Sequence, residues 1–319
     1  MRFSSKTPTF DPKNHDMRSQ LALALLALLF SCSEPATRKD MDPEKAATFD
    51  WQGHRGARGL LPENTVPAFL KALEYPQVKT LELDLAVSQD GLLVVSHEPW
   101  MNYKICSHPD GRPVLENEED ELILYQMPYD SIRQYDCGSR GNAGYPQQKA
   151  MPVHKPLFRE VVRAAEQYCQ EKGRPMPRYN IEIKFEPEYV GVKAPDAETF
   201  ARLVLEEITR LGIKERCCIQ SFDVGPLQHL HRMDPGLFTA LLIDNAHGVE
   251  DNLNELGYLP NAYSPYYKLV TANMVKIVHD KGLLLIPWTV NDTTAMKALI
   301  ALGVDGIITD YPNLIGAVE

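Results

Sequence analysis

Thr80 to His97 reads TLELDLAVSQDGLLVVSH, and its first half alternates leucine with acidic residues. Side chains two residues apart share one face of a strand, so Glu82 and Asp84 point one way and the leucines point the other. The leucines suit an outer layer of helices, which sends both carboxylates inward. A half-buried strand facing solvent would show the same alternation, but a barrel has no such strand. Because unpaired charges are costly in an interior, the pattern predicts a barrel strand beside a hard cation.

Candidate strands and helices alternate along most of the chain. The predicted strands are 50–53, 80–87, 92–97, 179–185, 217–222, 238–243, 261–264, 284–290 and 306–309. The predicted helices are 64–74, 158–171, 196–211, 224–233, 272–281 and 293–302. Repeated strand–helix alternation predicts an α/β fold of the (β/α)8 barrel type. A doubly wound open sheet is the alternative, although no glycine-rich turn follows the first strand.

Residues 99–156 interrupt this alternation as an insertion after the second barrel strand region. The segment is rich in Pro, Gly, Tyr and acidic residues, and its acidic run at 116–121 is typical of a solvated surface rather than a metal site. Long loops inside compact domains are usually functional. We therefore expect the insertion to lie over one end of the barrel, within a domain that spans 49–319.

Residues 180–184, NIEIK, repeat the alternation on a later strand. Glu182 and Lys184 share a face, so Glu182 would bring a third carboxylate to the barrel axis. Three carboxylates without Cys or His ligand spacing predict an all-oxygen site for Ca²⁺ or Mg²⁺. Lys184 would place a positive charge beside a phosphate or an anionic transition state. The alternative is a buried ion pair between Glu182 and Lys184.

A hairpin brings a histidine toward the first two carboxylates. Asp90-Gly91 is a hairpin turn signal, and a two-residue loop there would place His97 opposite Asp84. A register two residues away would pair His97 with Glu82 instead. Both registers put His97 on the carboxylate face of the strand.

The first predicted strand ends in Gly53-His54-Arg55-Gly56, at the position where barrel enzymes place active-site groups. The guanidinium fork of Arg55 fits phosphate oxygens, and His54 titrates near neutral pH. Four residues alone are a weak signal. Combined with two acidic strands and His97, they indicate an active site.

Together these segments resemble the glycerophosphodiester phosphodiesterase family of metal-dependent (β/α)8 barrels. The matching segments, in the family's order, are His54–Gly56, Pro62–Thr65, Ala68–Phe69, Glu82–Asp84, Asp90–His97, Asn180–Lys184, Gln220–Phe222, Trp288–Asn291 and Gly303–Pro312. They extend from about Gly53 to Pro312, which covers the whole predicted barrel. One departure is His97-Glu98, where the family commonly has His-Asp, and it keeps the negative charge.

The resemblance implies a role for each matched position. The implied roles are ligation of one divalent cation, Ca²⁺ or Mg²⁺, by Glu82, Asp84 and Glu182, acid–base catalysis by His54 and His97, and phosphate binding by Arg55 and Lys184. Gln220 and Trp288, on later strands, would line the pocket or else simply fill the barrel.

The activity that the resemblance implies is hydrolysis of glycerophosphodiesters to sn-glycerol 3-phosphate and an alcohol. A cation makes the phosphorus electrophilic, and two histidines in opposite protonation states move the protons. Direct attack by water and a cyclic phosphate intermediate both fit. Two alternatives are a phospholipase-D-like enzyme on intact lipids and a non-catalytic surface binding protein that kept the barrel.

The N-terminal segment has the pattern of an export signal. Residues 21–30 form an apolar run that is too short to span a bilayer. Leu29-Phe30-Ser31-Cys32 resembles a lipobox, which predicts a signal peptide over 1–31, lipidation of Cys32 and a tether over 32–48. The true start is Met1 or Met17, and an N-terminal helix packed on the domain is the alternative. We expect an exported bacterial lipoprotein, anchored to a membrane in the periplasm or at the cell surface.

The chain is acidic, with 33 Lys and Arg residues against 43 Asp and Glu residues and a formal charge of −10. Nucleic-acid binders depend on neutralising phosphates, so this charge argues against such a partner. The expected partners are a small glycerophosphodiester and the membrane, and the oligomeric state stays open.

Cysteines of exported proteins often form disulfides, because the environment outside the cytoplasm is oxidising. Cys106 and Cys137 both lie in the insertion, where a bridge would hold together a loop without a core of its own. Cys217 and Cys218 are neighbours at the start of a strand, and we expect them to pack in the core.

Overall fold

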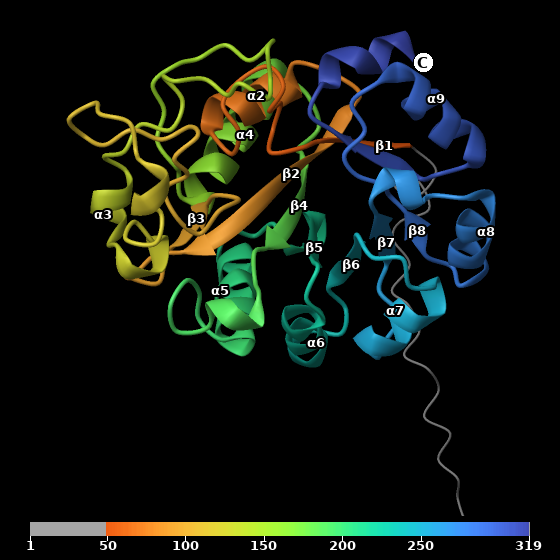
Figure 1. Ribbon diagram of the computed structural model, residues 1–319. Coiled ribbons are helices and arrows are strands. Elements are labelled where there is room, and N and C mark those ends of the chain that lie inside the picture. Colours follow the sequence, from red (N-terminus) through yellow and green to blue (C-terminus); the bar gives the residue numbers. More distant parts are fainter. Residues whose placement is uncertain (1–48, 319) are drawn as a thin grey trace, which may run out of the picture. The chain divides into compact units, whose positions relative to one another are not determined.

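The computed structural model describes residues 49–318, so the predicted signal peptide, Cys32 and the tether lie outside the described residues. Parallel strands form a ring in the order β8-β7-β6-β5-β4-β2-β1-β9 (Figure 1). They are β1 (Asp50–Gly53), β2 (Val78–Val87), β4 (Arg178–Ile183), β5 (Cys217–Ser221), β6 (Phe238–Ile243), β7 (Ala262–Pro265), β8 (Leu284–Leu285) and β9 (Gly306–Thr309). Backbone hydrogen bonds from Asp305 N to Leu285 O (2.9 Å) and from Val290 N to Ile308 O (3.0 Å) join the last two strands. The predicted (β/α)8 barrel is confirmed.

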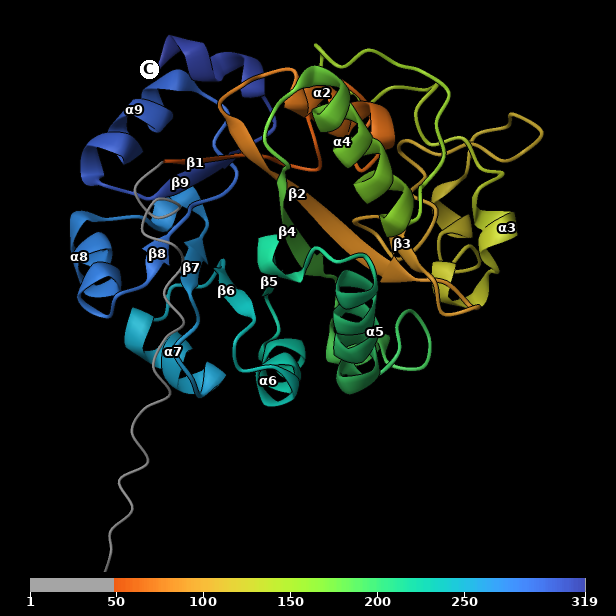
Figure 2. The ribbon, with the colours of Figure 1, turned by 180° about the vertical axis from the view of Figure 1, so that it is seen from behind.

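Helices cover the outside of the ring (Figure 2). They are α2 (Val66–Leu73), α4 (Phe158–Lys172), α5 (Ala197–Arg210), α6 (Val224–Met233), α7 (Val249–Leu256), α8 (Ala272–Asp280), α9 (Thr293–Leu302) and the 3₁₀ helix η6 (Pro312–Ala317). Helix α7 is missing from the predicted set. It lies between Gly248 and Gly257, which ends the helix in the left-handed conformation at φ +81°. No helix within 49–318 is both long and apolar enough to cross a membrane.

Strand β8 is shorter than the predicted 284–290. The chain beyond it still runs alongside β7, since Ile286 N donates to Tyr263 O (3.1 Å) and Trp288 N donates to Pro265 O (3.1 Å). Pro287 has no N–H to donate to a ladder, which is a physical reason for the early end of the regular strand.

The two faces of β2 separate as the alternation predicts. Leu81, Leu83 and Leu85 are fully buried in the cluster that also contains Phe69 of α2 and Phe158 of α4. The acidic residues between them face the barrel axis. Inside the ring, β6 to β9 contribute an apolar cluster of small and branched side chains, namely Ala240, Ala262, Ile286 and Ile308. The opposite half, β1, β2, β4 and β5, supplies the buried polar residues Gln52, Glu82, Asp84, Asn180, Glu182 and Gln220.

The hairpin register differs from the predicted one. Strand β3 (Leu93–Val95) pairs antiparallel with β2, and Leu85 lies opposite Val95. Ser96, rather than His97, follows opposite Asp84, because Ser96 N donates to Asp84 O (3.0 Å). The loop between the strands has three residues instead of two, and it ends in Gly91 at φ +74°. A left-handed glycine at this position is typical of three-residue hairpin loops, and the extra residue shifts the register by one.

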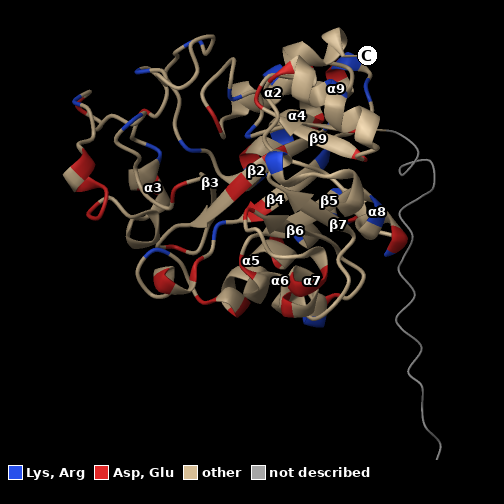
Figure 3. Ribbon diagram, turned by 45° about the vertical axis from the view of Figure 1, so that its right-hand side comes forward, with Lys and Arg blue, Asp and Glu red and all other residues tan. Residues whose placement is uncertain are grey.

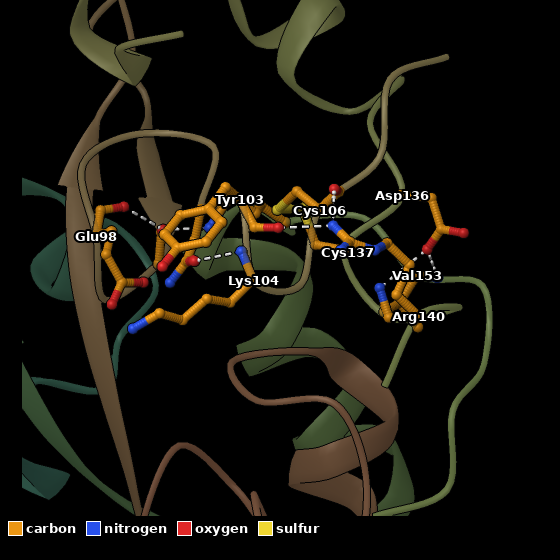
Figure 4. The surroundings of a disulfide bond; sticks show 12 residues. Glu98, Tyr103, Lys104, Cys106, Asp136, Cys137, Arg140 and Val153 are labelled. Atoms are coloured by element: carbon orange, nitrogen blue, oxygen red, sulfur yellow. Dashed lines mark hydrogen bonds between the residues drawn. A yellow bond between two sulfur atoms is a disulfide. The ribbon is translucent and has the colours of Figure 1, made fainter. Parts of the chain in front are cut away.

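Buried residues of the insertion form a small core with Ala86 of β2 and Val94 of β3, contrary to the expectation of a coreless loop. Met101, Ile105, Leu124 and Ile132 are buried together there, beside the 3₁₀ helices η1 (Glu116–Glu118) and η2 (Leu124–Gln126) and the short helix α3 (Tyr129–Ile132). A disulfide joins Cys106 and Cys137 (Figure 4). Cys217 is buried as expected, while Cys218 is only partly buried.

The insertion contacts the loops at the carboxyl ends of the strands. Lys149 N donates to Leu60 O (2.9 Å), and Gln148 Nε2 donates to Arg58 O (2.7 Å), both in the loop between β1 and α2. On another side, Gln126 Nε2 donates to Val192 O (3.2 Å) in the segment between β4 and α5. The insertion therefore borders one end of the barrel, where the predicted site residues lie.

Candidate active site

Three carboxylates meet where β2 and β4 run side by side. Asp84 lies opposite Glu182 in the parallel register, and one oxygen each of Glu82, Asp84 and Glu182 lies within 4.8 Å of the others. All three residues are buried, and Figure 3 shows acidic positions on β2 and β4 near the middle of the molecule. Burial and the neighbouring carboxylates raise the pKa of Glu82. Burial raises the pKa of Glu182 against the opposing charge of Lys184. The predicted ligands thus form one group whose members repel each other.

Asp84 is bound through one of its two carboxylate oxygens. Its Oδ2 accepts a hydrogen bond from Asn64 Nδ2 (2.7 Å) and lies 3.2 Å from Arg55 Nε. Burial alone would raise the pKa of Asp84, but the charges of Arg55 and Lys184 and the hydrogen bond from Asn64 hold it well below its usual range. Its Oδ1 is buried and has no hydrogen-bond partner among the described residues.

The loop between β1 and α2 reaches the carboxylates through strained backbone. Arg55 and Asn64 adopt left-handed conformations, at φ +50° and +56°, which are uncommon for residues other than glycine. In this shape Arg55 N donates to Glu82 Oε2 (2.9 Å) and Asn64 N donates to Arg55 O (3.0 Å). Asn64 has no predicted role, although it lies in a matched segment. Its polar side chain just before a helix is the only signal that the sequence offers.

His54 is held by a carboxylate that the sequence reasoning missed. Its Nδ1 lies 2.7 Å from Asp310 Oδ1, just after β9. Asp310 also accepts hydrogen bonds from Arg58 Nε (2.7 Å) and Asn291 Nδ2 (2.6 Å). Burial alone would raise the pKa of Asp310, but His54 and Arg58 hold it well below its usual range, so the carboxylate accepts from Nδ1–H. Its place directly after a barrel strand was the available signal.

The imidazole of His54 is neutral at physiological pH. Burial, together with the nearby charge of Arg58, lowers its pKa to about 4. With the proton on Nδ1, Nε2 carries a free electron pair and lies 3.9 Å from Glu82 Oε2. His54 therefore presents a proton acceptor beside the carboxylate group.

His97 reaches the same group from beyond β3, despite the different register. Lys184 Nζ lies 3.2 Å from His97 Nε2, and His97 Nδ1 lies 2.8 Å from Glu98 Oε1. An ammonium group can only donate, so Nε2 accepts from Lys184 and Nδ1–H donates to Glu98. Burial alone would raise the pKa of Glu98, but His97 and the charges of Lys155 and Arg55 hold it well below its usual range. Both histidines are thus oriented by a carboxylate on Nδ1.

The two predicted phosphate ligands are both paired with acidic residues. Lys184 Nζ lies 2.8 Å from Glu182 Oε1, which is the ion pair foreseen as the alternative. Arg55 Nη1 lies 2.8 Å from Glu63 Oε1, a partner without a predicted role. Both cations nevertheless lie within the site, next to the carboxylates and the histidines.

A cavity of about 280 Å³ opens onto these groups. Its lining residues include His54, Arg55, Glu82, His97, Glu182, Gln220, Phe222 and Trp288. Gln220 Nε2 donates to Glu82 Oε1 (3.0 Å), so this residue also orients a carboxylate. Trp288 is oriented by a hydrogen bond to Ser264 O (2.8 Å) and meets Phe222 edge to face, with ring centroids 5.3 Å apart. Gln220 and Trp288 therefore line the pocket, and Phe222 and Arg58 are lining residues without a predicted role.

Comparison with known proteins agrees with this geometry. The glycerophosphoryl diester phosphodiesterase family matches residues 54–314. A glycerophosphodiester phosphodiesterase of Bacillus subtilis is 28% identical over 304 residues, covering 94% of this chain and 95% of the relative. A Silicibacter pomeroyi structure, provisionally assigned as a glycerophosphoryl diester phosphodiesterase, has 27% identity and a TM-score of 0.75, covering 85% of this chain and 93% of that one. A phosphodiesterase from Oleispira antarctica, solved with the product sn-glycerol-3-phosphate, shares the fold at 20% identity and a TM-score of 0.65, covering 84% of this chain and 96% of that one. The chain belongs to the glycerophosphoryl diester phosphodiesterase family.

Proposed function

We propose that this protein hydrolyses glycerophosphodiesters to sn-glycerol 3-phosphate and an alcohol, with a divalent cation and two histidines. The observation that carries the proposal is that Glu82, Asp84 and Glu182 form one group beside a cavity. That cavity is lined by Glu82, Glu182, His54 and His97. Family membership supports the reaction class. The geometry of the five side chains supports the roles assigned to them here.

The three carboxylates fit a hard divalent cation such as Ca²⁺ or Mg²⁺. Asp84 Oδ1 supports this fit, because a buried carboxylate oxygen without a hydrogen bond lacks the partner that it needs. The raised pKa values of Glu82 and Glu182 point the same way, since excess negative charge there favours any bound positive charge. When bound, such a cation would draw electron density from a phosphoryl oxygen and make the phosphorus more electrophilic.

The histidines divide the proton transfers. His54 is neutral and offers a free Nε2, so it accepts the proton of the attacking group, either water or a substrate hydroxyl. His97 must first take up a proton on Nε2, which turns it into an imidazolium, and it then donates that proton to the departing alkoxide. Glu98 at Nδ1 stabilises the positive charge of the imidazolium. Each transfer contributes roughly 10²–10⁴-fold to the rate.

Arg55 and Lys184 bind the phosphate oxygens. Both side chains are buried within the site for most of their length, so their charges act at close range on an anion in the cavity. When Arg55 and Lys184 bind the phosphate, their ion pairs with Glu63 and Glu182 become weaker. If Glu182 held a divalent cation, Lys184 would be free to bind a phosphate oxygen instead of Glu182.

A substrate panel tests the proposal. The protein is treated with chelator, resupplied with Ca²⁺, Mg²⁺ or Mn²⁺, and given glycerophosphocholine, glycerophosphoethanolamine, glycerophosphoglycerol or intact phosphatidylcholine. Release of sn-glycerol 3-phosphate, the product seen in the Oleispira antarctica structure, is measured by a coupled dehydrogenase assay. We expect turnover of the glycerophosphodiesters only when a cation is present.

His54→Gln should lower this turnover by about 10²–10⁴-fold, while His229→Gln, on the outer helix α6, is the matched control that should retain it. Cleavage of intact lipid alone would favour the phospholipase-D-like alternative. Failure to cleave any substrate with any of the cations would contradict the proposal.

A further inference from the structure

Lys155 is a buried lysine that has no part in the reaction described above. It lies at the end of the insertion, three residues before α4, and only 6% of its surface is exposed. Its Nζ donates a hydrogen bond to Ser96 Oγ (2.6 Å), and Ser96 Oγ donates in turn to Glu98 O (2.6 Å). Lys155 therefore lies behind the short segment Ser96–Glu98, which carries His97 into the site.

Nearby carboxylates stabilise the positive charge of the buried Lys155. Burial lowers the pKa of Lys155, while the charges of Glu98, Glu63 and Asp84 oppose that effect. The interaction is mutual, because Lys155 is one of the charges that keep Glu98 ionised. A buried ammonium is costly unless it is compensated, so its position among these carboxylates indicates an electrostatic role.

The insertion holds Lys155 in place from both sides. Val95 N donates to Pro156 O (2.8 Å), which ties the following residue to β3. Cys137 N donates to Val153 O (2.7 Å), which ties the preceding segment to one end of the disulfide. Figure 4 shows Val153 beside Asp136 and Cys137 in this arrangement. The insertion thus borders the site and also holds the charged side chain of Lys155 next to it.

We propose that Lys155 is a positioning residue for the hydrolysis proposed above, and that it acts through Glu98 on His97. Its ammonium group supports the Ser96–Glu98 segment and balances the Glu98 carboxylate. Glu98 in turn accepts from Nδ1–H of His97, so Nε2 faces the substrate and is the atom that takes up and then transfers the proton. This inference rests on the proposed function for its kinetic consequence, and on the hydrogen bonds of His97 for its structural one.

A double-mutant cycle tests the coupling. Lys155→Met should lower kcat by about 10-fold and leave KM nearly unchanged, because the side chain orients an acid and touches no substrate. Glu98→Gln should lower kcat at least as much, and the double variant should be no slower than Glu98→Gln alone. Lys155→Arg should restore part of the loss, since it keeps the charge. Lys149→Met, an exposed lysine of the same insertion, is the matched control and should behave as the wild type.

Losses in kcat that add in the double variant would overturn the proposal, as would an unchanged kcat in a folded Lys155→Met protein. Folding of each variant is checked by thermal unfolding and by intact mass without reduction. Should Lys155→Met fail to fold, Ser96→Ala takes its place in the same cycle. Ser96→Ala removes the hydroxyl between Lys155 and Glu98 O, and it should show the same lack of additivity with Glu98→Gln.

Nitrogen NMR separates this proposal from the proposed function. The imidazole signals of His97 are identified by their loss in His97→Gln, and they report the tautomer without any substrate. We expect Nδ1–H in the wild type and a mixture of tautomers in Lys155→Met. The same tautomer in both proteins would overturn the role of Lys155, whereas a wild type that cleaves no diester would overturn only the proposed function.

Discussion

Adding Ca²⁺ or Mg²⁺ to chelated protein should raise its thermal midpoint. Glu82, Asp84 and Glu182 are buried within 4.8 Å of one another, and burial and mutual repulsion raise the pKa of two of them. A cation that binds only the folded chain stabilises it by RT ln(1 + [L]/Kd), about 2.7 kcal/mol at a hundred times Kd. For a domain of this size, 1 kcal/mol shifts the midpoint by roughly 2–4 °C, so the expected rise is about 5–10 °C.

The rise should shrink as the pH is lowered. A raised pKa means that Glu82 and Glu182 take up protons at a higher pH than ordinary glutamates, whose pKa is about 4.3. Protons then compete with the cation for the same oxygens, so acidification weakens binding. Differential scanning fluorimetry across cation concentration and pH measures both effects.

Two variants make this measurement specific. Glu182→Gln removes one ligand charge and should abolish most of the cation-dependent rise, whatever its effect on the midpoint without cation. Glu215→Gln changes an exposed acid on the 3₁₀ helix η4 (Lys214–Arg216) and should keep the full rise. An equal rise in both variants, or no rise in the wild type with Ca²⁺, Mg²⁺ or Mn²⁺, would refute the metal site.

Other predictions concern the histidines and the cysteines. His54→Gln and His97→Gln should each lower kcat by about 10²–10⁴-fold while the cation-dependent midpoint rise persists, as steady-state kinetics and fluorimetry together would show. The lowered pKa of His54, about 4 against an ordinary 6.5, means that the unfolded chain binds the extra proton between these values. Acidification through that window should therefore reduce the free energy of unfolding by up to roughly 3 kcal/mol, and denaturant titrations of His54→Gln should lack this component. Replacing Cys106 and Cys137 with serine should cost about 3–4 kcal/mol by the chain-entropy argument, and a wild type that unfolds identically with and without reductant would contradict this. Cys32→Ala should abolish labelling by a fatty-acid analogue in a bacterial host, and unchanged labelling would refute the proposed lipid anchor.

The acidic strand was predictable because its signal is local. The alternation in TLELDLAV assigns leucines to the helix side and carboxylates to the axis, and the structure has both faces as expected. The next acidic strand, NIEIK, carries the same information, so the meeting of three carboxylates followed from two short stretches. The residue pattern alone made His54 and His97 candidates for the site. Their role in acid–base catalysis came from the resemblance to the family.

The hairpin register was not predictable from its turn signal. Asp90-Gly91 fits a two-residue loop and also the end of a three-residue loop, and the observed loop closes from Ser88 to Leu92. His97 still reaches the site, because the chain leaves the strand after Val95 and the side chain is directed by Glu98 and Lys184. A one-residue error in register therefore had no consequence for the site.

Partners that lie far apart in sequence were missed for a common reason. Asp310 lies 256 positions from His54, and Lys155 lies 59 from Ser96. Lys155 carries no local pattern. Asp310 lies in the matched segment Gly303–Pro312, but no role was predicted for it because its partner His54 is distant in sequence. The core of the insertion was missed similarly, since its buried residues follow no helix or strand period.

Charge balance joins the metal site, the histidines and the insertion in one argument. Among the described residues, the acids that line the cavity or bind a lining residue are Glu63, Glu82, Asp84, Glu98, Glu182 and Asp310. The corresponding cations are Arg55, Arg58 and Lys184, and Lys155 stands behind them through Ser96. With both histidines neutral, six negative charges face four positive ones. Burial is the main cause of the raised pKa values of Glu82 and Glu182, and the neighbouring carboxylates add to it. One bound divalent cation would balance this excess of two negative charges. Without Lys155 the excess of negative charge would be larger. Glu98, the carboxylate that orients His97, would lose a positive charge that stabilises its ionised form.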